Sequence, residues 1–310
     1  MTPAEAIPRD GRGPISMSNL QLFTMCVAIW GSTWLAIKFQ LGRVAPEASV
    51  FWRYLIAAAI VFAYCRVRRL PLGFSRQDHL WFVLMGALMY CLSYVFVYYA
   101  EEHVVSGLVA VGYSASPLLA MIGMRVFFGT PMTARVTVGS LLGIVGIVLV
   151  FGSEFAKVGG DRDTFLGATY TAIAVVLSTF GAMVAHRSHL RGIPLWQGMA
   201  WGMLYGAFWS LAITLATGKA VDFEATWAYV LSLLYLAVLG SVIAFAGYLT
   251  LLHRIGVARS GYIGVMVPIV ALLVSAAFES FRFHPLLWVG VAISVVGNVV
   301  ILRSPKAGHA

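Results

Sequence analysis

The sequence predicts an all-α polytopic membrane protein with ten transmembrane helices, arranged as two inverted five-helix repeats. Three observations support this fold class: the apolar composition, the positions of the basic residues and an internal repeat. Of the 310 residues, 60% are hydrophobic and only 11% are charged, and the mean hydropathy is +0.88. A soluble domain carries about 25% charged residues, so this chain lacks the polar surface of a water-soluble protein.

Ten apolar runs are long enough to cross a bilayer, whose core of about 30 Å needs roughly 20 apolar residues per helix. The runs are 20–38, 48–65, 79–99, 104–127, 136–152, 165–185, 195–217, 227–252, 260–278 and 286–302. They divide the chain into five predicted segments. These are a disordered cytoplasmic tail at 1–19, a first repeat at 20–152, a periplasmic connection at 153–163, a second repeat at 164–303 and a cytoplasmic tail at 304–310.

The basic residues predict the orientation of the chain in the membrane. With ten spans, fourteen Lys and Arg residues fall on the side of the two termini and six on the opposite side, while Arg53 lies inside a span. Cytoplasmic loops carry an excess of Lys and Arg. We therefore expect a multi-pass protein of the bacterial inner membrane with both termini in the cytoplasm. The net charge of +9 does not indicate nucleic-acid binding, because the bases lie in short gaps between apolar runs rather than on one polar face.

The sequence offers no catalytic or metal-binding motif. An intramembrane enzyme would need a catalytic dyad or a metal constellation inside the spans, whereas the seven histidines lie near span ends or outside them. The cysteines Cys26, Cys65 and Cys91 are widely spaced in apolar runs, which indicates neither a disulfide framework nor a zinc site. We therefore expect no enzyme activity, no cofactor and no metal. The expected partners are a small-molecule substrate and the lipid bilayer.

A shift of the chain by 151 residues superimposes landmarks of its two halves, which is the mark of an internal repeat. The aligned pairs are Pro117 with Pro268, Gly139 with Gly290 and Gly146 with Gly297. Each repeat would hold five spans, and because five is odd, the second repeat would cross the membrane in the opposite sense. Inverted repeats are typical of secondary transporters, which bind substrate near the midplane between the repeats.

Two segments, "WGSTWLAIKF" (30–39) and "FWRYLIAAA" (51–59), and the Pro-to-Gly segments of the repeat resemble the EamA-type carriers of the drug/metabolite transporter superfamily. The resemblance covers roughly residues 20–303, and within the superfamily the chain is most similar to bacterial aromatic amino acid exporters. It implies ten helices in two repeats and export of amino acids, aromatic ones among them, by alternating access. A broad exporter of drugs or other metabolites is the alternative. The family often places a Glu after the fourth and ninth spans; here Glu279 matches, but Phe128 stands at the other position.

Two aromatic stripes are candidates for lining a substrate cavity. Trp30 and Trp34 lie on one helical face with Lys38 one turn further, and Tyr94 and Tyr98 repeat this spacing. Such rings hold flat apolar solutes by stacking, but Trp and Tyr also form belts at the membrane–water interface. The spacing leaves both interpretations open.

Pro117 and Pro268 predict interruptions at matched positions of two helices. A proline removes a backbone donor and frees the carbonyl four residues earlier, here those of Tyr113 and Gly264. Interrupted helices at corresponding positions of two halves indicate a transporter site, and a kink that only improves packing is the alternative. The predicted substrate-binding residues are Trp30, Trp34, Lys38, Tyr94, Tyr98, Tyr113, Ser114, Ser116, Tyr248, Tyr262 and Gly264.

Arg53 is the one basic residue well inside a predicted span, and an intramembrane arginine normally has a partner. We expect either a structural latch with one of the acids at the span ends, Glu47, Glu101 or Glu279, or a clamp for a substrate carboxylate. No Asp, Glu or His lies deep inside a predicted span. This absence predicts that no buried carboxylate couples protons and that solute moves down its own gradient.

The fifth and tenth spans carry small residues at helical spacing. They are Gly139, Gly143 and Gly146 in the fifth span and Gly290, Ser294 and Gly297 in the tenth. Such residues allow two membrane helices to approach closely. We therefore expect these two spans to form a scaffold away from the substrate path.

Overall fold

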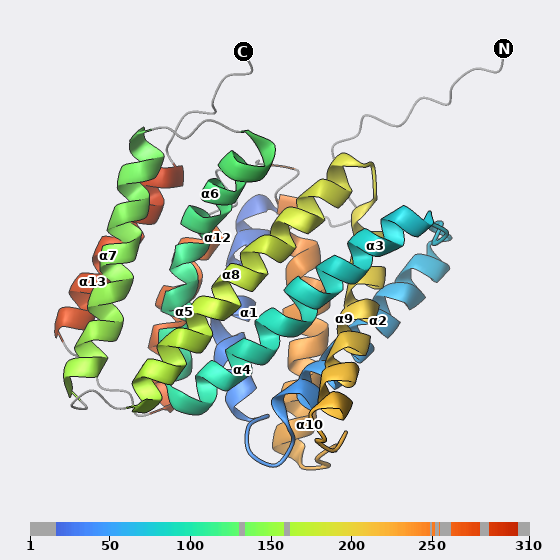
Figure 1. Cartoon of the computed structure of the whole chain (residues 1–310), viewed down its shortest axis with the longest axis horizontal. Coiled ribbons are helices and arrows are strands. Elements are labelled where there is room, and N and C mark those ends of the chain that lie inside the picture. Colours follow the sequence, from blue (N-terminus) through green and yellow to red (C-terminus); the bar gives the residue numbers. More distant parts are fainter. Residues whose placement is uncertain are drawn as a thin grey trace.

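The computed structural model describes residues 17–129, 134–157, 162–248, 250, 251, 254, 262–279 and 285–302 (Figure 1). Every regular element in these ranges is a helix. The predicted tail at 304–310, most of the tail at 1–19 and residues 158–161 of the predicted connection lie outside them.

The first half of the chain contains seven α-helical segments. These are α1 (Asn19–Lys38), α2 (Pro46–Val67), α3 (Arg76–Met85), α4 (Ser93–His103), α5 (Ser106–Gly112), α6 (Ser116–Phe128) and α7 (Ala134–Lys157). A π-helical segment, Gly86–Leu92, joins α3 to α4 without a break, and a 3₁₀ turn, Tyr113–Ala115, joins α5 to α6. The predicted third span, 79–99, is therefore the middle of a longer continuous helix.

The second half follows a similar plan. Its described α-helices are α8 (Arg162–Leu190), α9 (Leu195–Ala216), α10 (Trp227–Leu234), α12 (Tyr262–Phe278) and α13 (Pro285–Leu302). A π-helical segment, Tyr235–Ile243, extends α10, as Gly86–Leu92 extends α3. Shifted by the 151-residue repeat, the two π-helical segments overlap almost completely.

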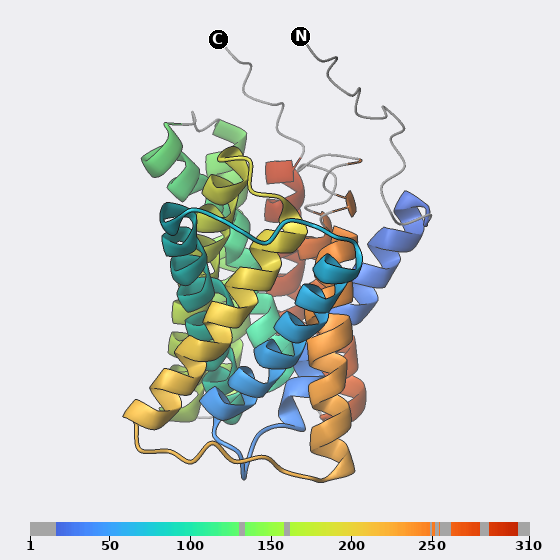
Figure 2. The same cartoon turned by 90° about the vertical axis from the view of Figure 1, so that its right-hand side faces the viewer.

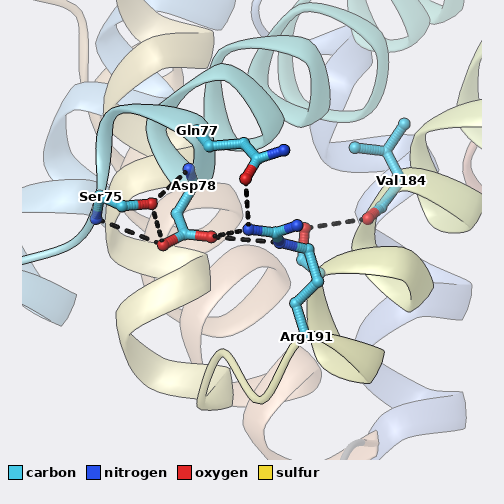
Figure 3. Close-up of polar contacts among 6 residues, drawn as sticks. Ser75, Gln77, Asp78, Val184 and Arg191 are labelled. Carbon is cyan, nitrogen blue, oxygen red and sulfur yellow. Dashed lines mark hydrogen bonds and ion pairs between the residues drawn. The ribbon is translucent and has the colours of Figure 1, made fainter.

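Local sequence explains where several helices begin. Ser18 and Gln21 form a capping box at the start of α1, and Ser75 and Asp78 form one at the start of α3 (Figure 3). In each box the serine hydroxyl accepts the backbone N–H of the third helical residue, whose side chain accepts the serine N–H. Pro46 occupies the first position of α2, where the missing N–H costs nothing.

Seven helices in the described part of the chain are long and apolar enough to cross a membrane. They are Asn19–Lys38, Pro46–Val67, Arg76–His103, Ser106–Phe127, Arg162–Ser188, Leu195–Ala216 and Trp227–Tyr248. Three shorter apolar helices lie at Thr137–Val150, Met266–Phe278 and Pro285–Val300. The fold is thus that of a helical membrane protein, and the count of ten spans stays a prediction.

The helices of the two halves are interleaved. The main contacts pair α7 with α13, α2 with α9, α4 with α8, and both α1 and α5 with α12. In Figure 1, α7 and α13 stand together at one edge, and in Figure 2, α2 lies beside α9 and α10. Each of these pairs joins a helix before residue 158 to one after residue 161. Contacts between the two halves therefore build the bundle.

Small residues bring α7 and α13 together, as predicted from their spacing. A Cβ atom added at Gly146 would lie 2.5 Å from the carbonyl oxygen of Gly290, and one added at Gly290 would lie 2.7 Å from that of Gly146. The contact thus requires both glycines. Gly143 differs, because a Cβ atom there would meet no atom within 4 Å. The backbone of Gly143 still belongs to the contact, because a Cβ atom added at Gly297 would lie 2.7 Å from its nitrogen.

The two ends of the bundle need names. We call the end at which α1 begins the near end, and the end at which α1 reaches Lys38 the far end. The start of α2, the end of α4, the start of α5 and the end of α12 lie at the far end. The connections from α1 to α2 and from α9 to α10 also run along it (Figure 2). The connection from α8 to α9 lies at the near end.

Candidate functional site

A cavity of about 370 Å³ lies inside the bundle, between helices of both halves. Its lining includes six aromatic residues, which come from α1, α4, the turn after α5 and the helix that follows α10. The aromatic residues are Trp30, Trp34, Tyr94, Tyr113, Phe245 and Tyr248. This volume lies within the range of small-molecule sites. No three His, Cys, Asp or Glu side chains in the described ranges lie close enough together to hold a metal ion.

Contacts between neighbouring rings hold the aromatic lining in place. The ring centroids of Trp34 and Tyr113 are 5.1 Å apart in an edge-to-face arrangement, and Trp30 lies 5.3 Å from Phe245 and 5.4 Å from Tyr248. The indole N–H of Trp30 donates to the carbonyl oxygen of Gly240 at 3.1 Å. These contacts favour a preformed cavity, since edge-to-face pairs are stabilising beyond their burial.

Most of the predicted substrate-binding residues line this one cavity. They are Trp30, Trp34, Tyr94, Tyr113, Ser116, Tyr248 and Gly264, and Pro268 joins them. The structure thus brings seven of the eleven candidates and one of the two prolines to one place.

Other predicted residues lie elsewhere. The hydroxyl of Tyr98 donates to the side-chain oxygen of Gln40 at 2.8 Å, and the backbone oxygen of Ser114 accepts from Asn298 at 3.4 Å. Lys38 lies at the far end, outside the cavity lining. Pro117 lies in α6 and Tyr262 begins α12, and the side chains of both fall outside what the structure describes.

Pro117 and Pro268 differ in the backbone structure around them. Before Pro117 the chain tightens into the 3₁₀ turn Tyr113–Ala115, and the N–H of Ser116 donates to the carbonyl of Tyr113. The carbonyl that the proline was expected to free therefore already has a donor. Pro268 lies inside α12 and itself lines the cavity beside Gly264.

Sequence reasoning missed Phe245, although the repeat contained the signal. A shift of 151 residues carries Tyr94 onto Phe245 and Val97 onto Tyr248, and all four line the cavity. The same shift relates Tyr113 to Gly264. Applying the repeat to each candidate in turn would have found Phe245 without a structure.

Arg53 lies at the cavity wall with only 2% of its surface exposed. Its Nε donates to the hydroxyl of Ser241 at 3.1 Å, and the guanidinium carbon lies 4.4 Å from the centroid of the Tyr94 ring. The nitrogen Nη1 is buried and has no hydrogen-bond partner. The predicted latch between Arg53 and Glu279 is not formed, because Glu279 has other partners.

Glu279 belongs to a polar cluster at the far end. Lys38 Nζ lies 3.9 Å from its carboxylate, and the N–H and hydroxyl of Ser106 donate to it at 3.2 and 2.5 Å. The hydroxyl of Ser275 donates to the same carboxylate. Lys38 also donates to the carbonyl oxygens of Glu101 and Val104. This far-end cluster ties α1, α4, α5 and α12 together.

Two carboxylates are buried, contrary to expectation. Glu47 is 1% exposed and accepts from Lys219 at 2.9 Å and from the hydroxyl of Tyr99. Glu101 is fully buried, and neither of its carboxylate oxygens has a hydrogen-bond partner. The expectation was wrong because α4 continues to His103, which carries Glu101 into the packed bundle. The argument against a buried carboxylate that couples protons therefore fails.

Lys219 follows α9 in the connection to α10 and forms the other half of the Glu47 contact. Burial favours the neutral amine, but the hydrogen bonds to Glu47 and Tyr99 outweigh it, so the pKa of Lys219 is raised above its usual value. The contact joins the start of α2 to the end of α9, one helix from each half.

The cavity leads toward the near end. A second cavity of about 260 Å³ shares Met89, Phe245 and Tyr248 with the first and reaches Pro194, in the connection from α8 to α9. One ion pair, between Asp78 and Arg191 at 3.1 Å, joins α3 to the end of α8 at the near end (Figure 3).

Comparison with known proteins extends these observations. The chain is 25% identical to the uncharacterized inner membrane transporter YedA of Escherichia coli K12, over 90% of this chain and 89% of that protein. It is 24% identical to the uncharacterized transporter YoaV of Bacillus subtilis, over 79% and 82% of the two chains. A solved crystal structure shares the fold, with a TM-score of 0.67 at 17% identity over 91% of this chain and 96% of that one.

The family model of the EamA-like transporters matches residues 18–152 and, separately, residues 165–303. The two matches cover most of the chain and include every residue that lines the cavity. A transporter needs a solute site within a bundle of membrane helices, and the aromatic cavity lies in such a place. The chain therefore belongs to the EamA-like transporter family and is a multi-pass membrane transporter.

Proposed function

We propose that the protein exports amino acids, aromatic ones among them, across the bacterial inner membrane by alternating access. The observation that carries this proposal is the cavity of about 370 Å³, lined by six aromatic rings within the bundle. An aromatic side chain can stack on such rings. A second cavity continues from the first toward the near end, as alternating access would require of a conformation open to that side.

The proposal includes ten spans in two inverted repeats. The family model matches each half separately, and repeat-related residues such as Tyr94 and Phe245 meet at the same cavity. Contacts also follow the repeat: α1 packs on α12, and its counterpart α8 packs on α6, the counterpart of α12. These correspondences support a two-fold relationship between the halves. The three shorter apolar helices, in α7, α12 and α13, would then be spans as well.

The near end would face the cytoplasm. This assignment follows from the excess of Lys and Arg in the gaps at that end. The structure then corresponds to an inward-facing conformation, in which solute enters past Pro194 and Tyr248. Release would require the far-end cluster to separate.

Counterflow in proteoliposomes tests the proposal. Vesicles loaded with unlabelled phenylalanine should take up labelled phenylalanine faster than empty vesicles, because exchange needs no energy source. Trp34→Ala should slow this exchange, whereas Trp209→Ala should not, because Trp209 is an exposed tryptophan of α9 outside the cavity. Absence of exchange with every aromatic amino acid, in protein that is folded, would contradict the proposal.

A broad exporter of drugs or other metabolites is a second candidate. The mainly apolar lining of the cavity favours it, since Val97, Ile263 and Val267 make no solute-specific polar contact. Competition by structurally unrelated apolar compounds separates the two. Broad competition supports the second candidate, and competition by amino acids alone supports the first.

A further inference from the structure

We propose that Arg53 and the indole N–H of Trp34 bind the carboxylate of the transported solute. The cavity would therefore select aromatic carboxylates and reject aromatic cations that lack a carboxylate. This inference rests on the proposed function and names the substrate class of the same site.

The first observation is a buried charge with an unused donor. Arg53 is 2% exposed, lines the cavity and leaves Nη1 without a hydrogen-bond partner. A buried charge is costly unless it is paired and hydrogen-bonded. The acids that could have paired with Arg53 are engaged elsewhere or make no contact. Glu279 is held by Lys38, and Glu47 by Lys219.

Glu101 is the remaining acid of this region, and it lies on α4 beyond Val97, outside the cavity lining. No ion pair or hydrogen bond joins it to Arg53, and its own carboxylate oxygens have no hydrogen-bond partner. Within the described ranges, Arg53 therefore has no anion as a direct partner, and Glu101 attracts it only without contact. A solute carboxylate would supply that anion.

The second observation is a second unused donor in the same cavity. Trp34 lines the cavity, and its buried Nε1 has no hydrogen-bond partner. Its ring is held edge-to-face by Tyr113 at a centroid distance of 5.1 Å. A carboxylate has two oxygens and about four acceptor positions, so it can accept from both Arg53 and Trp34. Two buried donors without partners therefore belong to residues that line the same cavity.

The surrounding contacts hold Arg53 in position. Its Nε donates to the Ser241 hydroxyl at 3.1 Å, and that hydroxyl donates to the carbonyl of Leu236 at 2.9 Å. The second bond spans five residues within the π-helical segment Tyr235–Ile243, and π-helical turns often occur at functional sites. With Tyr94 below the guanidinium at 4.4 Å, Arg53 needs little reorganisation to bind an anion.

The charge of Arg53 also predicts what the cavity rejects. A solute cation would bring a second positive charge into a water-poor site, where like charges repel more strongly than in bulk water. An aromatic carboxylate places its charge on Arg53 and Trp34 and its ring among the aromatic residues. An aromatic amine has the ring but no group for these two donors.

Three related compounds separate the contribution of the carboxylate from that of the ammonium group. Phenylalanine has both charged groups, 3-phenylpropionate has only the carboxylate, and phenethylamine has only the ammonium group. In phenylalanine counterflow with wild-type protein, 3-phenylpropionate should compete and phenethylamine should not. Equal competition by the amine would overturn the inference.

Variants test the two donors. Arg53→Gln should raise the half-inhibitory concentration of 3-phenylpropionate about tenfold or more, the loss expected from one charge-assisted hydrogen bond. Trp34→Phe keeps a ring but removes the N–H, and should weaken the same competitor severalfold. Arg43→Gln is the matched control, because Arg43 is an exposed arginine between α1 and α2. Unchanged competition in both Arg53→Gln and Trp34→Phe would overturn the inference.

A binding measurement on wild-type protein tests the inference even if transport cannot be measured or a variant does not fold. The melting temperature of purified wild-type protein should rise with 3-phenylpropionate but not with phenethylamine, since a ligand of the folded state stabilises it. If wild-type protein exchanges no amino acid but shows this selectivity, the proposed function fails and the carboxylate site stands. If it exchanges phenylalanine but binds both probes equally, the carboxylate site fails and the proposed function stands.

Discussion

The ammonium nitrogen of Lys38 lies 3.9 Å from the carboxylate of Glu279, and this ion pair joins the end of α1 to the end of α12. Glu279 also accepts from Ser106 at the start of α5. One carboxylate thus gathers three helices at the far end, the end opposite the second cavity. The single glutamate that matched the family pattern is the centre of this contact.

The first prediction is that Glu279→Gln weakens closure of the far end. The variant removes the charge that Lys38 faces but keeps the size of the side chain. A cysteine introduced at Ala110, which is buried in the cavity wall, should then react about tenfold faster with an impermeant thiol reagent added on the periplasmic side. A factor of ten corresponds to about 1.4 kcal/mol.

Glu102→Gln serves as the control for this experiment, because Glu102 is the exposed neighbour of Glu101 on α4. The three native cysteines are buried, so their background labelling should be low. Equal labelling rates in Glu279→Gln and wild-type protein would show that the far-end cluster does not govern access.

The second prediction contrasts two buried glutamates. Glu101→Met should leave the thermal stability unchanged or raise it by about 1–3 kcal/mol, because it removes a buried polar group without hydrogen-bond partners. Glu279→Met should lower the stability, because Ser106 and Lys38 lose their acceptor. Thermal unfolding in detergent measures both. A destabilised Glu101→Met would indicate that Glu101 has a stabilising partner.

The third prediction concerns the contact of α7 with α13. Gly290→Ala should destabilise the protein by about 1–3 kcal/mol, since its Cβ would lie 2.7 Å from a backbone oxygen that cannot move aside easily. Gly143→Ala should not, because its Cβ would meet no atom within 4 Å. Unfolding in detergent gives the comparison, and similar losses in both variants would argue against this packing.

The fourth prediction concerns topology. A cytoplasmic reporter fused at Ala310 should be active, and a periplasmic reporter inserted in the connection around 154–163 should be active as well. The reason is the excess of Lys and Arg on the side of the termini. Activity of either reporter in the opposite compartment would contradict the ten-span arrangement.

Much of the candidate site could be predicted from local spacing. Trp30 and Trp34 are four residues apart, so one helical face carries both whatever the rest of the fold does, and both line the cavity. Gly146 and Gly290 predicted a close helix contact for the same local reason. Helix ends were harder, because Glu101 and Glu102 end the apolar run while α4 continues to His103.

The sequence by itself determined the class of the protein: an apolar chain must form membrane helices, because only helices satisfy their own backbone hydrogen bonds in lipid. The tertiary structure alone decided which charges meet. Glu279 lies beside Lys38 rather than Arg53, and Arg53 lines the cavity and keeps a buried donor without a partner. The physical reason is that spacing along one helix orders only the residues of that helix. The partners across the bundle depend on how each helix is rotated and how far it is shifted along its neighbours, and packing sets both.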